Sequence, residues 1–237
     1  MWEVGSAAVT SIHTPDSAIV AGHVLDEASS RVARYLSCHA QTVKHCDMRA
    51  GSWATLSQDA VASSRRPFLN SRISREQGNQ LVARAKTADW SLLSVHQPLA
   101  SKDQREDDAT MARALGLYAH FLDPKIPGVS RGKVHKILYI MRPAYFPIVD
   151  SRLARLYRKP ALEWNSELRR AGGQSDYFAP AYWAAIRADI RRNTDVIKHI
   201  RTKLSSANSG EHTEVIARLT DVRILDMLAW SMESAGC

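Results

Sequence analysis

The chain has 237 residues, of which 45% are hydrophobic and 24% charged, as expected for a globular protein with a substantial core. No apolar run approaches the length of a membrane span, and the opening MWEVGSAAVTSIHTPD lacks an export-signal pattern, so we expect a cytoplasmic protein. The formal net charge of +8 favours a polyanionic partner.

The first half of the chain combines helical patterns with one irregular stretch. Apolar residues after Pro15 follow helical spacing to about Ser37, which predicts a first helix. The Ser-rich stretch 40–70 predicts a loop with one short helix at most. Ser74 and Gln77 form a capping-box pattern that predicts a helix over 75–87, and 88–96 either extends this helix or forms a second short one.

A longer helix follows the polar link SKDQREDD, and Pro124 and Pro127 end it. Its apolar positions, at spacings of three and four, are Met111, Leu115, Tyr118 and Leu122. Another helix is predicted over 130–141, and the two prolines of RPAYFP (142–147) break it. Asp150 opens the next helix. Later helices are predicted over 160–171, 179–204 and 213–233.

Helical spacing therefore dominates, and no internal repeat or alternating strand pattern is visible. The sequence predicts an all-α, multi-helix fold. We expect residues 1–237 to form a single globular α-helical unit, built as one lobe or two.

The turn PGVS (127–130) joins two predicted helices, which is the layout of a helix-hairpin-helix element. Its glycine lets the backbone pass close to a phosphodiester, and the first amides of the second helix point towards the anion. Val129 is expected to pack inward and pin the two helices. The residues expected to contact DNA here are Pro127, Gly128, Val129, Ser130, Arg131, Gly132, Lys133 and Lys136. The alternative is an ordinary turn between two helices, in which Pro127 and Gly128 only end one helix and precede the next.

The segments PGVSRGK (127–133) and FPIVDSRLARLYR (146–158) together resemble the core of the helix-hairpin-helix DNA glycosylase superfamily, the endonuclease III-like fold. There, a PGVG-type hairpin precedes an aspartate in a V-D-x-x-hydrophobic-x-R pattern. Val149, Asp150, Leu153 and Arg155 match that pattern, and Gly128 precedes Asp150 by 22 residues, close to the usual separation. The resemblance covers 107–158, and Ser130 departs from it because the pattern usually has glycine there.

This resemblance implies that Asp150 is the catalytic carboxylate. A carboxylate near C1′ stabilises the oxocarbenium-like sugar and orients or deprotonates water, once the target base has flipped out of the duplex into a pocket. The alternative role of Asp150 is a helix N-cap, and the two roles are compatible. Arg152 and Arg155 are expected to hold the DNA backbone or Asp150 itself, with a solvated helix face as the alternative.

Relatives that also nick the strand carry a lysine nucleophile four residues after the hairpin glycine, where this chain has Gly132. Lys133 comes one residue later, about 100° around a helix. The resemblance therefore implies a monofunctional enzyme that leaves an abasic site, with any lyase role of Lys133 left open. The four-cysteine iron–sulfur loop of some relatives is absent, so no metal or other cofactor is expected.

Other residues give weaker indications of function. His135 either contacts phosphate or is a buried helix histidine. The irregular region offers base-stacking or wedge candidates, with core packing as the better interpretation for the aromatic ones. These candidates are Trp53, Phe68, Asn70 and Arg72. The aromatic residues Tyr177, Phe178, Tyr182 and Trp183 are better interpreted as core residues than as the lining of a pocket. Asp226 and Trp230 form an i, i+4 pair that is most simply structural.

The sequence thus predicts a DNA glycosylase acting on a damaged or modified base of double-stranded DNA, in repair or in defence against hypermodified phage DNA. Neither a membrane nor an obligate protein partner is expected. The alternative is a non-catalytic helix-hairpin-helix DNA-binding module. A nuclease or RNA-directed enzyme would need clustered acidic metal ligands, for which no motif is visible. The run from FLNSRIS (68–74) to LDMLAW (225–230) also resembles uncharacterised bacterial proteins with an FP-I-x-DSR core, a likeness that supplies no activity.

Overall fold

The computed structural model describes residues 14–101, 103–170, 179–207 and 213–232, and these are predominantly helical, as predicted. From the amino end, the elements are β1 (Ala18–Val20), β2 (His23–Leu25), α1 (Ala28–Cys38), α2 (Ala40–Thr42), η1 (Val43–Asp47), α3 (Gln58–Ser63), α4 (Arg75–Ala85) and η2 (Trp90–Leu92). They continue with α5 (Gln104–Leu122), α6 (Arg131–Met141), α7 (Ser151–Leu156), α8 (Arg158–Arg170), α9 (Ala179–Arg192), α10 (Thr194–Ala207), α11 (Thr213–Arg218) and α12 (Asp221–Ser231).

The prediction of a helix from Pro15 to Ser37 is wrong in its first half. Strands β1 and β2 form an antiparallel hairpin in which Ala18 lies opposite Leu25. Ala21 and Gly22 turn the chain with φ values of 51° and 84°, the left-handed conformation that two-residue hairpin turns require and that a helix excludes. The expectation of no strand pattern is therefore corrected, and the helical part begins only at Ala28.

Two long predicted helices are each divided in the structure. The 179–204 segment breaks at Asn193, whose side chain accepts a hydrogen bond from Ile19 N (2.8 Å) and donates one to Ile19 O (2.6 Å). The 213–233 segment breaks before Thr220, which caps α12 through Arg223 N and donates to Pro143 O (2.9 Å). Both breaks serve contacts with distant segments, which helical spacing does not reveal.

Helices predicted from local signals are confirmed. The capping box of Ser74 and Gln77 begins α4, α5 ends at Leu122 before the prolines, and α6 covers Arg131–Met141. The stretch 88–96 forms only the short turn η2, which Asp89 caps through Ser91 N.

The core has Trp183 of α9 at its centre. Its ring packs edge-on against those of Tyr118, His135, Tyr145 and Phe146, with centroids 5.3–5.9 Å apart. Tyr182 and Trp183 are therefore core residues, as the sequence favoured. The other two aromatic residues of that group, at positions 177 and 178, lie outside the described residues.

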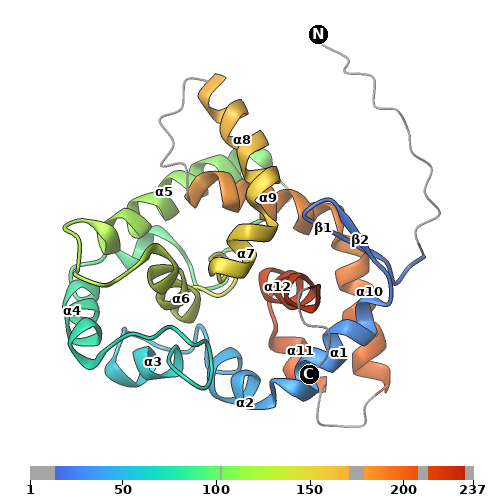
Figure 1. Ribbon diagram of the computed structural model, residues 1–237, viewed down its shortest axis with the longest axis horizontal. Helices are drawn as coiled ribbons and strands as arrows, with labels where there is room; N and C mark the ends of the chain where they lie inside the picture. Colours follow the sequence, from blue (N-terminus) through green and yellow to red (C-terminus); the bar gives the residue numbers. More distant parts are fainter. Residues whose placement is uncertain (1–13, 102, 171–178, 208–212, 233–237) are drawn as a thin grey trace.

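Elements from the two ends of the chain pack together, since α1 lies against α10 and α12 (Figure 1). The central helix α12 faces α7, and α6 and α2 lie around the same middle region of the molecule (Figure 1). Within the described ranges, no helix combines the length and apolar character needed to cross a membrane.

Candidate functional site

A pocket of about 770 Å³, called here the central pocket, lies between α1, α2, α6, α7, α12 and the segment 66–72. This volume is within the range of small-molecule sites. Its lining includes six basic side chains, namely Arg66, Arg72, Lys133, Lys136, Arg152 and Arg223. Two carboxyl groups, those of Asp150 and Asp226, face the same space.

Asp150 is the N-cap of α7. Its Oδ1 accepts hydrogen bonds from the backbone amides of Arg152 (2.9 Å) and Leu153 (3.1 Å), which confirms the capping role. Oδ2 accepts no hydrogen bond from any residue that the structure describes. The half-buried carboxyl group is thus oriented through one oxygen, and Asp150 lines the central pocket.

The turn between α5 and α6 has the conformation expected of its glycine. Gly128 has φ 71°, and the flanking Ile126 and Val129 are buried, so Val129 packs inward as predicted. Ser130, which departs from the glycine of the pattern, caps α6 by accepting from Lys133 N (3.3 Å).

The start of α6 lies against the backbone next to Asp150. A Cβ atom on Gly132 would be 3.2 Å from the carbonyl oxygen of Val149 and 4.0 Å from Asp150 Cα. A residue without a side chain at position 132 therefore allows the two helix starts, of α6 and α7, to approach each other.

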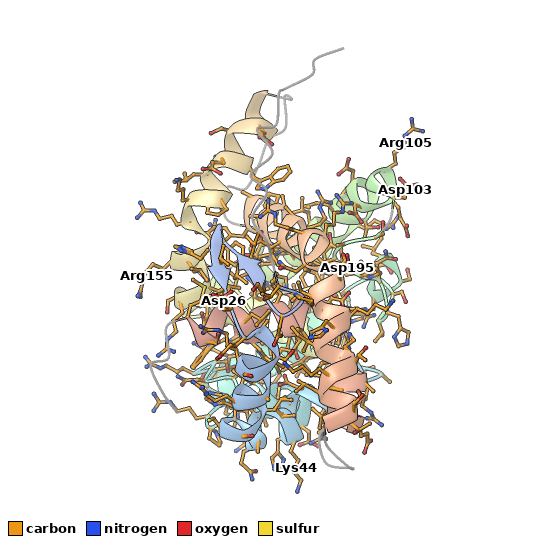
Figure 2. The ribbon with its side chains drawn as sticks, turned by 90° about the vertical axis from the view of Figure 1, so that its right-hand side faces the viewer. Asp26, Lys44, Asp103, Arg105, Arg155 and Asp195 are labelled. Carbon is orange, nitrogen blue, oxygen red and sulfur yellow. The ribbon has the colours of Figure 1, made fainter. Side chains whose placement is uncertain are left out.

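The residues predicted to bind DNA occupy four kinds of position, and Ser130 belongs to two of them. Exposed at the turn and the first residue of α6 are Pro127, Gly128, Ser130 and Arg131. Within the central pocket are Ser130, Gly132, Lys133, Lys136 and Arg152. Val129 is buried and unable to contact DNA through its side chain. Arg155 is exposed but does not line the central pocket, and it points outward from the molecule (Figure 2).

Lys133 uses its ammonium group to hold the turn. Nζ donates to Gln77 Oε1 (2.8 Å) and to Gly128 O (2.9 Å), and Gln77 Nε2 donates to Pro127 O (3.2 Å). Partial burial lowers the pKa of Lys133. These contacts fix the ammonium group at the turn.

Lys136 connects α6 to the segment 66–72, which forms another wall of the central pocket. Its buried Nζ donates to Leu69 O (2.7 Å), in the segment 66–72. Burial lowers the pKa of Lys136, although the nearby Asp150 and Asp226 act to raise it. Asn70 and Arg72 in this segment have φ values of 53° and 51°, which are unusual for residues with side chains.

Three of the four wedge candidates line the central pocket. Phe68, Asn70 and Arg72 do so, and the Phe68 ring also packs against that of His45, with centroids 5.0 Å apart. Trp53 lies outside the pocket lining and stacks beneath the guanidinium of Arg49 at 4.4 Å.

A buried charge network forms the floor of the central pocket. Arg223 donates to both carboxylate oxygens of Asp47 (3.1 and 3.0 Å), to Tyr35 Oη (2.8 Å) and to Asp226. Tyr139 Oη also donates to Asp47 (2.8 Å). No motif in the sequence singles out Arg223, Asp47 or Tyr139 as residues of a site.

Asp226 was interpreted from the sequence as part of a structural pair with Trp230, and both residues line the central pocket. Burial raises the pKa of Asp226 to about 7, Arg223 opposes this shift, and Asp150 adds to it. Trp230 lies under the Arg152 guanidinium at 4.3 Å. The sequence signal that could have identified these pocket residues is the pair Arg223 and Asp226, three residues apart in the otherwise apolar VRILDML (222–228).

His135 is buried and has a structural role. Its Nε2 accepts from Trp183 Nε1 (3.1 Å), and its Nδ1 lies 3.0 Å from Arg131 O. Burial lowers the pKa of His135 to about 4, so the ring is neutral near pH 7. The buried-histidine interpretation is confirmed.

Among the described residues, no three His, Cys, Asp or Glu side chains gather as metal ligands would. The model of a family described as of unknown function, DUF6308, matches residues 57–233. No curated protein and no solved structure matches the chain.

Proposed function

The chain belongs to the DUF6308 family, whose function is unknown, and we propose that it is a monofunctional DNA glycosylase using Asp150 as its catalytic carboxylate. The observation that carries the proposal is the position of Asp150. One of its oxygens is held by two backbone amides, and the residue lines a pocket of about 770 Å³. The substrate is a damaged or modified base in duplex DNA, a target met in the cytoplasm.

The chemistry follows from the charge that develops during hydrolysis. As the bond from C1′ to the base breaks, the sugar becomes cationic, and a fixed carboxylate beside it stabilises that state without reorganising. Because the cap holds Asp150 Oδ1, the orientation of the group is set before substrate arrives. The other oxygen then faces the sugar or orients the attacking water.

Two further features support a DNA substrate. The turn before α6 combines a left-handed glycine with a buried Val129, as a helix-hairpin-helix element would, and the first amides of α6 suit a phosphate. The pocket lining carries more basic than acidic side chains, so a strand crossing its mouth would be attracted. In this reading the segment 66–72, with Phe68 and Asn70, forms the wall against which the flipped base rests.

Water is the nucleophile in this proposal. Gly132 occupies the position that is lysine in strand-nicking members of the glycosylase superfamily. The ammonium group of Lys133 donates hydrogen bonds to Gln77 and to the carbonyl oxygen of Gly128 in the turn. Neither residue supplies a free amine directed at C1′. The product is an abasic site in an unbroken strand.

The test is incubation of the purified protein with duplex oligonucleotides that each carry one damaged base, and with phage DNA containing hypermodified bases. We expect release of a free base, measured by mass spectrometry, and strand breakage only after alkali. Binding of duplex DNA without base release from any substrate would contradict catalysis. It would instead favour the non-catalytic DNA-binding module, which needs only the turn and the basic residues around it.

A further inference from the structure

We propose that Asp226 is a second catalytic residue of the central pocket, the acid that protonates the departing base while Asp150 acts at the sugar. This inference rests on the proposed glycosylase function and deepens it. It assigns the floor of the pocket, formed by α12, to the leaving base.

The position of Asp226 is the first argument. Asp226 and Asp150 are the two carboxyl groups that line the central pocket, and they come from helices far apart in the sequence. They are close enough for Asp150 to raise the pKa of Asp226. Asp226 Oδ2 accepts from Arg223, while Oδ1 accepts no hydrogen bond from the part of the chain that the structure describes.

The surrounding charges favour a proton on Asp226. Arg223 is buried and already forms a two-point ion pair with Asp47, so this one guanidinium group is shared between two buried carboxyl groups. A second full negative charge in this apolar setting is unfavourable. Protonation of Asp226 removes it and leaves a hydrogen-bond donor at the pocket floor.

Charged and titratable groups of several neighbouring elements act on Asp226. They are Tyr35 of α1, Asp47 of η1, Lys136 of α6, Asp150 at the start of α7, Tyr157 after α7, and Arg223 of α12 itself. Burial outweighs the effect of Arg223, which is why the pKa of Asp226 reaches about 7. Two carboxyl groups in one pocket with different environments are the usual arrangement of an acid and its partner.

The Asp226 carboxyl proton passes to a ring nitrogen or exocyclic oxygen of the base, and the electron pair of the C1′–N bond leaves with the base, which departs neutral. The oxygen of water bonds to C1′, and a water proton passes to Asp150. Asp150 returns this proton to solvent, and Asp226 takes one back from solvent.

The experiment measures single-turnover base release on the oligonucleotide panel for the wild type, Asp226→Asn and Asp221→Asn. Asp221 is a matched control on the same helix, exposed and paired with Arg201 (2.7 Å) at the surface. For Asp226→Asn we expect a rate reduced by about 100-fold or more, with duplex affinity unchanged. The control is expected to keep the wild-type rate.

The pH dependence separates acid catalysis from support of the fold. The wild-type rate is expected to fall above about pH 7 as Asp226 loses its proton, and this limb should be missing in Asp226→Asn. In the wild type alone, the same limb should be steep for bases that leave poorly and shallow for bases that leave well. This comparison holds even where the variant fails to fold.

The outcomes distinguish the two proposals. Wild-type base release that Asp226→Asn and alkaline pH leave unchanged overturns the role of Asp226 and leaves the glycosylase function standing. Absence of base release by the wild type on the whole panel overturns the glycosylase function, and the acid role falls with it.

Discussion

The ammonium group of Lys136 lies 2.7 Å from the carbonyl oxygen of Leu69, and this bond ties the segment 66–72 to α6. Helix α6 begins beside Asp150, and the segment 66–72 lines the central pocket opposite it, with Phe68, Asn70 and Arg72 among its lining residues. One buried lysine thus connects two walls of the pocket that are remote in sequence.

Lys136→Met is therefore expected to loosen the segment 66–72. The substitution removes the donor to Leu69 O, and a buried carbonyl without a partner costs on the order of 1–3 kcal/mol. Hydrogen exchange measured by mass spectrometry should show faster exchange in peptides that cover 66–72. Lys44→Met, at an exposed position (Figure 2), is the control and should leave the exchange unchanged. Equal exchange in wild type and Lys136→Met would show that the bond does not hold the segment.

A pair of glycine substitutions tests the close approach of α6 to Asp150. Gly116 is an exposed residue in α5, and a Cβ atom added to it would have no neighbour within 4 Å, so Gly116→Ala should raise the free energy of unfolding by up to about 1 kcal/mol. Gly132→Ala should raise the free energy of unfolding by less than Gly116→Ala does, or should lower it, because its Cβ would lie 3.2 Å from Val149 O. Urea unfolding gives both values. An equal gain at the two positions would mean that the contact at Gly132 is not tight.

The buried His135 predicts a loss of stability in acid. Its pKa is about 4 in the folded protein, below the ordinary 6.5, so the folded state keeps the ring neutral. The stabilisation is present above pH 6.5 and is lost as pH falls towards 4, by on the order of 3 kcal/mol at most. His135→Gln has no such titration and should show a smaller change in Tm between pH 7 and 4.5. Parallel Tm curves for the two proteins would contradict this assignment.

Arg131, exposed at the first residue of α6, is predicted to contact a DNA phosphate. Arg131→Gln should weaken binding to all duplex sequences alike and reduce the slope of log affinity against log salt concentration by about 1. Arg105→Gln is the matched control, because Arg105 is exposed and projects from the start of α5 (Figure 2). Fluorescence anisotropy at several salt concentrations measures both slopes. A slope that Arg131→Gln leaves at the wild-type value would remove this contact from the proposal.

Local signals made part of this architecture predictable. Prolines after Leu122, a capping residue before α4 and Asp150 before α7 each act within a few residues, so their helix boundaries followed from the sequence. The hairpin at 18–25 was missed because its short apolar segments also fit a helical period, and the turn at Ala21 and Gly22 carries no strong sequence signature.

The composition of the central pocket was less predictable, because it depends on contacts between distant segments. Asp226 and Arg223 follow helical spacing like any buried pair, and only the packing of α12 beneath Asp150 brings them to the pocket. The segment 66–72 was recognised only as irregular. Its place opposite Asp150 depends on the buried Lys136, which the sequence placed at the DNA surface.

The most direct test of the account compares two capping aspartates by single-turnover base release and duplex affinity. Asp150 caps α7 in the central pocket, while Asp103 caps α5 at an exposed site through Arg105 N (2.8 Å). Because each Asn can still cap its helix, Asp150→Asn should lose base release by about 100-fold or more with duplex affinity kept, and Asp103→Asn should match the wild type. Base release by Asp150→Asn at the wild-type rate would contradict a catalytic Asp150.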